Sequence, residues 1–197
     1  MNQFEKIDQL VQEYDGTIRT AQVLKAGIAK PTFYAYVKEK NLEQVSHGIY
    51  MSPDAWKDGM YLLHLRCAQA VFSHETALML HDLTDREPLR YSVTVKTGYN
   101  PSGLRSDGIQ VYTVKKDLHE IGLTSARTSF GHLVPVYDME RTICDLVRSR
   151  SHIEMQTFQD ALKQYARRKD KNLRILMHYA AKFHVEKILR QYLEVLL

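Results

Sequence analysis

The stretch TAQVLKAGIAKPTFYAYVKEK, residues 20–40, decides the fold of the first part of the chain. A short apolar helix that starts at Thr20 is followed by Gly27, which supplies the positive φ that a sharp turn between helices often demands. Pro31 suits the first position of the next helix, where its missing N–H costs nothing. The stretch therefore predicts a helix-turn-helix whose second helix runs to about Lys40.

The segments on either side of this stretch complete a winged-helix order. Apolar residues at helical spacing predict an amphipathic first helix, and they are Phe4, Ile7, Leu10 and Val11. Downstream, apolar residues of the segment 42–51 bracket a short polar stretch, which predicts a β-hairpin with Gly48 in its turn. Helix, helix, turn, helix and hairpin follow one another as in a winged helix, whose third helix enters the major groove of DNA.

The predicted helix-turn-helix also carries a basic surface. Between residues 19 and 40 the cations are Arg19, Lys25, Lys30, Lys38 and Lys40, against Glu39 alone. Such a surface is typical of nucleic-acid binding, because phosphate contacts dominate the affinity. The candidate DNA contacts on the helices and the hairpin are Arg19, Thr20, Lys30, Thr32, Tyr36, Lys38, Ser46 and His47.

The third helix is expected to turn Phe33 toward the core, with Tyr34 beside it. Thr32 and Tyr36 are then placed to reach base edges, while the lysines of the helix contact phosphate. A three-helix domain that binds protein instead of DNA remains the alternative.

The rest of the chain, residues 53–197, predicts a second domain after a winged helix that covers residues 1–52. Strand-like segments alternate with helical ones, so the fold class is α+β, with a mixed α/β domain and C-terminal helices. The expected strands are residues 70–72, 91–95, 109–114, 123–130 and 133–137. A long helix is expected over residues 56–69, with further helices capped by Ser73 and Asp138.

No arrangement of residues in this second domain predicts catalysis. Ser73-His74-Glu75 has residue types of a nucleophilic centre, but neighbours on a helical turn point in different directions, which favours a helix cap. Arg141 and Asp145 are spaced i,i+4 and predict a structural ion pair, partly buried beneath the sheet. The chain is therefore interpreted as a non-enzyme, with a nuclease or nuclease-derived enzyme as the enzymatic alternative.

Cofactor and metal sites are not expected either. The histidines form no HExxH pair, the two cysteines lie far apart, and no phosphate-binding glycine loop is present. The charged N-terminus MNQFEKIDQL, the scarcity of cysteine and the lack of a membrane-length apolar run predict a cytoplasmic protein without a membrane partner.

The formal net charge is +4, and the excess of cations lies in the last segment, residues 151–197. Its cations cluster in a secondary basic surface formed by Arg167, Arg168, Lys169, Lys171 and Arg174. This surface predicts either additional phosphate contacts or a solvated loop.

The run from Gly16 to Tyr34 and the following hairpin, residues 42–50, resemble the N-terminal domain of AbiE-type abortive-infection antitoxins, the regulators of type IV toxin–antitoxin systems. The blocks VFSHETAL, residues 71–78, and VYDMERTICDL, residues 136–146, extend the resemblance. One departure is Ala35, because relatives often place a basic residue near this position.

The resemblance implies a winged helix that binds double-stranded DNA at the promoter of its own operon, at repeated half-sites, and represses it. It also implies a C-terminal domain that antagonises a nucleotidyltransferase-like toxin without a stable complex. A ligand-responsive transcription regulator, with a sensing C-terminal domain, remains a further alternative.

Overall fold

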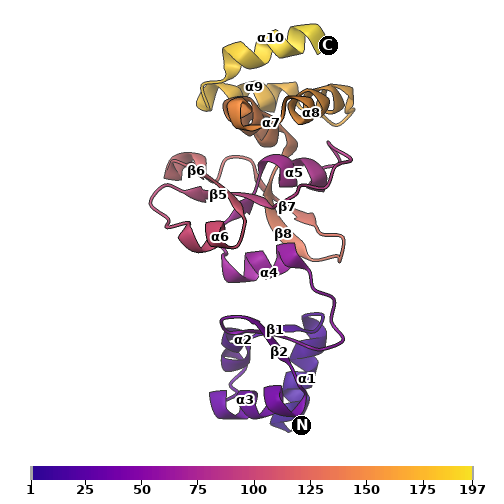
Figure 1. Cartoon of the computed structure of the whole chain (residues 1–197), viewed down its shortest axis with the longest axis vertical. Helices are drawn as coiled ribbons and strands as arrows, with labels where there is room; N and C mark the ends of the chain where they lie inside the picture. Colours follow the sequence, from indigo (N-terminus) through magenta and orange to yellow (C-terminus); the bar gives the residue numbers. More distant parts are fainter. Residues whose placement is uncertain (1, 197) are drawn as a thin grey trace. The chain divides into compact units, whose positions relative to one another are not determined.

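The computed structural model describes residues 2–196 and divides the chain into two compact units, Met1–Cys67 and Ala68–Leu197. The predicted winged helix ends within the first unit (indigo to purple in Figure 1), which also contains the linker and one further helix. The domain boundary was expected after residue 52, directly behind the hairpin. The two compact units are instead divided after Cys67, so the linker and this helix belong to the first unit.

The first unit has the predicted order of a winged helix. Its elements are α1 (Gln3–Glu13), β1 (Thr17–Arg19), α2 (Thr20–Lys25), α3 (Lys30–Glu39), β2 (Glu43–Ser46), β3 (Ile49–Met51) and α4 (Gly59–Arg66). The hairpin β2–β3 is confirmed, and β1 pairs antiparallel with β3 to give the sheet order β1-β3-β2. Only β1 was not expected: it has three residues and, unlike the equally short β3, it belongs to no hairpin that a turn glycine would mark.

Local signals fix the ends of these helices. The side chain of Asn2 accepts hydrogen bonds from the N–H groups of Phe4 (2.7 Å) and Glu5 (3.0 Å), and the Glu5 carboxylate accepts one from the Asn2 N–H. At Gly27 the backbone adopts φ of 80°, as the turn between α2 and α3 requires. Together the helices enclose an apolar core of Ile7, Val11, Ile18, Val23, Ile28, Phe33, Tyr36, Leu42 and Tyr50.

The helix expected over residues 56–69 is shorter than predicted. It begins at Gly59, because Asp58 caps it by accepting a hydrogen bond from the Tyr61 N–H at 3.1 Å. It ends at Arg66, where Cys67 leaves the helical conformation. Trp56 lies in the linker and is 80% exposed.

The second unit is built on a mixed five-stranded sheet with the order β6-β5-β4-β8-β7. Its strands are β4 (Val71–Phe72), β5 (Ser92–Lys96), β6 (Gln110–Val114), β7 (Leu123–Arg127) and β8 (Leu133–Tyr137). The pairs β5–β6 and β4–β8 are parallel, whereas β4–β5 and β7–β8 are antiparallel. The α+β class and the positions of the strands agree with the prediction.

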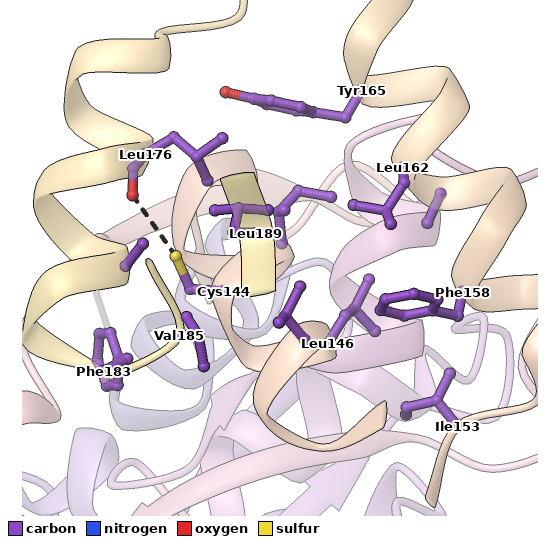
Figure 2. Packing of buried hydrophobic residues seen from close by; sticks show 14 of the residues in the cluster. Cys144, Leu146, Ile153, Phe158, Leu162, Tyr165, Leu176, Phe183, Val185 and Leu189 are labelled. Carbon is purple, nitrogen blue, oxygen red and sulfur yellow. Dashed lines mark hydrogen bonds between the residues drawn. The ribbon is translucent and has the colours of Figure 1, made fainter. Parts of the chain in front are cut away.

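Helices follow the strands and build most of the core. They are α5 (His74–Leu80), α6 (Ser102–Ser106), α7 (Met139–Arg148), α8 (Met155–Arg167), α9 (Leu173–Lys182) and α10 (Glu186–Leu196), with single 3-10 turns at Lys116–Leu118 and Arg150–His152. Figure 2 shows the apolar side chains that α7, α8, α9 and α10 contribute, among them Cys144, whose thiol points to the Leu176 carbonyl. None of the helices between residues 2 and 196 is long and apolar enough to cross a membrane.

The ion pair expected on α7 is present, and it is fully buried rather than partly buried. The Nε of Arg141 donates to Oδ2 of Asp145 at 2.9 Å, and neither side chain is exposed. The Nη1 of Arg141 also donates to the backbone carbonyls of Leu118 and Ile121, in the loop between β6 and β7. Because one guanidinium bonds both to the Asp145 carboxylate and to these carbonyls, it links the loop to α7.

Candidate nucleic-acid interface

The exposed face of α3 is the surface that a winged helix presents to DNA. Its outward residues, Pro31, Tyr34, Ala35 and Lys38, follow the spacing i, i+3, i+4, i+7 and therefore lie along one stripe of the helix. We call these four residues the outward stripe. Phe33 points inward and is completely buried, as predicted.

Tyr36 was expected to reach DNA, and the structure corrects this expectation. Only 2% of the residue is exposed, and its hydroxyl donates to Oδ1 of Asp8 on α1 at 2.7 Å. Its ring also meets Phe4 edge-on, with 5.4 Å between the ring centroids. Burial and the bonded carboxylate raise the pKa of the Tyr36 hydroxyl, which therefore stays protonated. Tyr36 fastens α3 to α1 and lies three residues from Phe33, on the same inner face.

Tyr34 takes the exposed place that the prediction gave to Tyr36. It is 47% exposed and belongs to the outward stripe. Its ring rests on Phe33 (5.9 Å between centroids) and on Tyr50 of the hairpin (6.4 Å), so its inner edge is supported. The signal that identifies it is the pair Phe33 and Tyr36: once these two define the buried face, Tyr34 must lie outside it.

The remaining candidates on α3 keep their predicted accessibility. Lys30 is the first residue of the helix and Lys38 belongs to its last turn, and both are exposed. Thr32 is half-buried beside them. The helix thus carries a cation at each end of its exposed face, where phosphates on the two sides of a major groove would lie.

The hairpin β2–β3, which forms the wing, lies against the start of α2. The Thr20 N–H donates to the carbonyl of Gly48 at 2.9 Å, and Gly48 turns the hairpin with φ of 68°. His47 is exposed at this turn, whereas Ser46 is half-buried next to a bulge in β2. Thr20 thus lies beside the turn that carries His47, but its hydroxyl is buried and makes no hydrogen bond within the described residues, so it is not placed to contact DNA as predicted.

Arg19 does not belong to the outward stripe of α3, because it lies at the start of α2. It is the N-cap residue of α2, and its N–H donates to Oε1 of Gln22 at 2.8 Å. The pKa of His64 on α4 is lowered by burial and by the charge of Arg19. The guanidinium therefore lies beside α4, and within the described residues its buried Nε has no hydrogen-bond partner.

The secondary basic surface of the second unit separates into paired and unpaired cations. Arg168 binds Asp170 through two hydrogen bonds of 2.8 Å, and Lys171 donates to the Arg168 carbonyl at 3.0 Å. Arg167, Lys169 and Arg174 are exposed and form no ion pair within residues 2–196. These three cations are the part of the surface that is free to meet a phosphate.

Ser73 is the N-cap residue of α5, as expected, but its hydroxyl makes no capping hydrogen bond to the helix within the described residues. His74 has a left-handed backbone (φ 49°), which brings its Nδ1 to 3.0 Å from the Ser73 hydroxyl. Its Nε2 lies 3.0 Å from the hydroxyl of Ser149, and its ring stacks on Tyr112. Neighbours on a helical turn are expected to point in different directions where both residues have helical backbone, and this condition is not met here. His74 is completely buried, so this group has no access to a substrate.

Metal ligands are not gathered anywhere in the described part of the chain. Between residues 2 and 196, no three or more histidine, cysteine, aspartate or glutamate side chains lie close enough to hold a metal ion. The buried polar groups near His74 are serine and threonine hydroxyls, which are poor ligands for the common protein metals.

Comparison with known proteins gives a fold likeness for the whole chain and a family match for part of the first unit. The whole chain is similar in fold to the crystal structure of the RV2827C protein from Mycobacterium tuberculosis, with a TM-score of 0.52 and 12% identity, over 98% of this chain and 82% of that chain. No curated protein matches the chain. Residues 5–53, which include the outward stripe and the wing, match the family described as transcriptional regulators of the AbiEi antitoxin type. This match confirms the resemblance seen in the sequence of this segment.

Proposed function

We propose that the chain is a DNA-binding antitoxin that represses the promoter of its own toxin–antitoxin operon. The family match to residues 5–53 supports the regulator and antitoxin part of this proposal. The promoter, its repeated half-sites and a nucleotidyltransferase-like toxin as functional partner follow from the family resemblance. On this proposal the second unit antagonises the toxin, without a stable complex and without catalysing a reaction.

The observation that carries the DNA-binding part is the exposed face of α3. Lys30 and Lys38 mark its two ends, and Tyr34 lies between them with its inner edge packed on the core. A helix that enters the major groove is expected to carry cations at the edges of its exposed face. Here the flanking lysines can contact phosphates while Tyr34 and Ala35 face the base edges.

A gel-shift titration of the full chain on its upstream promoter fragment tests this arrangement. Removing both lysines (Lys30→Ala with Lys38→Ala) should weaken binding about tenfold or more on all sequences alike. The slope of log affinity against log salt should become shallower by roughly 0.9 for each phosphate that is no longer neutralised. Lys163→Ala, an exposed lysine of α8, is the matched control and should leave both quantities unchanged. Unchanged affinity in a Lys30→Ala, Thr32→Ala, Lys38→Ala variant would rule out α3 as the recognition helix.

The antitoxin part is tested by co-expression with the neighbouring reading frame. The wild-type chain should restore growth when a nucleotidyltransferase-like neighbour is toxic, and a pull-down should recover no stable complex. The Lys30→Ala, Lys38→Ala variant should still restore growth, because its changes lie in the first unit. If this variant lost rescue at normal expression, DNA binding and antagonism would not be separable.

A further inference from the structure

The second unit contains a cavity of about 780 Å³ that neither DNA binding nor the core of the unit explains. It opens at the first residues of the parallel strands β5 and β6, Ser92 and Gln110, which pair with each other. Residues from α5, the loop before β5 and the start of α8 complete its walls. Cavities of roughly 300–1,000 Å³ are of the size that holds small-molecule ligands.

The rim of the cavity is held by contacts between two of its walls. Nη1 of Arg86, in the loop before β5, lies 3.4 Å from Oε2 of Glu154 at the start of α8. The Thr157 hydroxyl donates to the same oxygen at 3.2 Å. The charges of Arg86 and Glu154 therefore compensate each other, which leaves other polar groups of the cavity for a ligand.

The floor of the cavity is rigid. The Ser92 hydroxyl donates to Oε2 of Glu75 at 3.0 Å, which fixes that carboxylate. The ring of Tyr112 lies flat on the buried ring of His74, with 3.4 Å between centroids and 10° between planes. His74 is itself held between the hydroxyls of Ser73 and Ser149. Glu75 and Tyr112 are thus positioned before any ligand arrives, which lowers the entropic cost of binding.

Glu75, Tyr112 and Arg90 are among the polar residues of the cavity that keep groups without a protein partner within residues 2–196. Oε1 of Glu75 and the hydroxyl of Tyr112 make no hydrogen bond, and Arg90 makes no ion pair. Burial and the charge of Glu75 raise the pKa of Tyr112 to about 12, while Arg90 acts in the opposite direction. The Tyr112 hydroxyl is therefore close enough to Glu75 and Arg90 to be affected by both charges, and it stays protonated at neutral pH.

We propose that this cavity binds a small molecule that carries N–H donors next to an oxygen acceptor. The Glu75 carboxylate accepts from the N–H groups, Arg90 donates to a carbonyl, carboxylate or phosphate oxygen, and Tyr112 bonds either group. Two kinds of metabolite offer this chemistry: nucleotides, through the base and phosphate, and amino acids with a polar side chain. The proposal is independent of DNA binding, because occupancy of the cavity is measured directly.

The test is ligand binding to the full chain, by thermal shift and isothermal titration calorimetry. One panel contains the four ribonucleoside 5′-monophosphates, and the other contains L-arginine, L-lysine and L-glutamine. We expect a member of one panel to raise the melting temperature and to bind with Kd below about 1 mM. Binding by one panel alone identifies the source of the ligand.

Variants then locate the site. Glu75→Gln and Arg90→Gln should each weaken binding about tenfold or more, whereas Glu120→Gln, an exposed carboxylate paired with Lys96, should leave it unchanged. Arg90 is exposed and forms no ion pair within the described residues, so Arg90→Gln is expected to fold. This variant therefore tests the site even if Glu75→Gln fails to fold. The proposal is overturned if neither panel binds at millimolar concentration, or if Arg90→Gln binds as well as the wild-type chain.

Discussion

Helices α3 and α7 each span ten residues and carry charged side chains, but they place these charges in opposite environments. On α3 only Phe33 and Tyr36 are buried, and both lysines lie at the surface. On α7 every residue from Glu140 to Val147 is buried, the charged ones included. A charge that stays in water is available to a partner, whereas a buried charge must be neutralised by the fold itself. The charges on α3 are therefore available to a partner, whereas the buried charges on α7 serve the stability of the fold.

Removing a charge from α7 should give the largest effect. Asp145→Ala leaves the buried guanidinium of Arg141 without its carboxylate, and a buried charge left alone costs about 3–5 kcal/mol. The free energy of unfolding, measured by urea titration, should fall by this amount. Asp117→Ala, at an exposed carboxylate, is the matched control and should change it by about 0.5 kcal/mol or less. If Asp145→Ala kept its stability but lost rescue from the toxin, the pair would be functional, and the contrast between the two helices would fail.

Lowering the pH should destabilise the fold through a second buried group near α7, the imidazole of His74. Burial lowers the pKa of His74, and the charges of Arg148 and Arg141 add to the shift. Below pH 6.5 the unfolded chain takes up a proton at this residue while the folded chain does not. The stability contributed by neutral His74 is thus complete above this pH and is lost as the pH falls, by at most about 1.4 kcal/mol per pH unit.

Urea titrations between pH 7.5 and 5 measure this loss. His74→Asn removes the titrating group and keeps a residue type that tolerates the left-handed backbone (φ 49°). The variant should show a smaller decline of stability with acid than the wild-type chain. Equal declines in both chains would mean that His74 is not the group that titrates.

The same chemical change at two tyrosines of α3 tests the inner and outer faces of one helix. Tyr36→Phe removes the hydrogen bond to Asp8 and should cost about 1 kcal/mol of stability, with operator affinity unchanged. Tyr34→Phe should leave stability within about 0.5 kcal/mol and change the preference between the operator and altered sites. The opposite outcome, a loss of DNA binding in Tyr36→Phe alone, would place the wrong face of α3 on DNA.

The two tyrosines also show which features of the fold the sequence can predict. The order of the winged helix could be predicted, because Gly27, Pro31 and Gly48 act through their own backbone preferences. The inward or outward direction of Tyr34 and Tyr36 could not, since each residue turns a helix by about 100° and a small error in phase exchanges two faces. Such a phase is settled by contacts with α1 and the hairpin, which are distant in the sequence.

Contacts between distant segments also decided what was missed in the second unit. The ion pair on α7 could be predicted from its i,i+4 spacing, and the strands from their periodicity. The left-handed backbone of His74 could not, because it depends on Ser149 and Tyr112, which come from other elements. For the same reason the sequence contains no sign of the cavity above Tyr112: its lining residues are brought together only by the fold.

The smallest effect is expected where exposed charge lies outside the winged helix. Of the secondary basic surface, Arg168 and Lys171 are already bonded to their neighbours, so only Arg167, Lys169 and Arg174 can add phosphate contacts. Each phosphate that they neutralise would add roughly 0.9 to the salt slope of operator binding, a change that remains measurable when the loss of affinity is slight.

Replacing these three cations with glutamine and titrating the operator over a salt series decides their role, with Arg168→Gln as the control for a cation that is already paired. A shallower slope in the triple variant alone places DNA on this surface, and normal DNA binding with lost rescue from the toxin assigns it to antagonism. If neither quantity changes, the three cations behave as solvated charges. Exposure would then identify a binding surface only where, as on α3, the charged residues flank a side chain that the core holds in place.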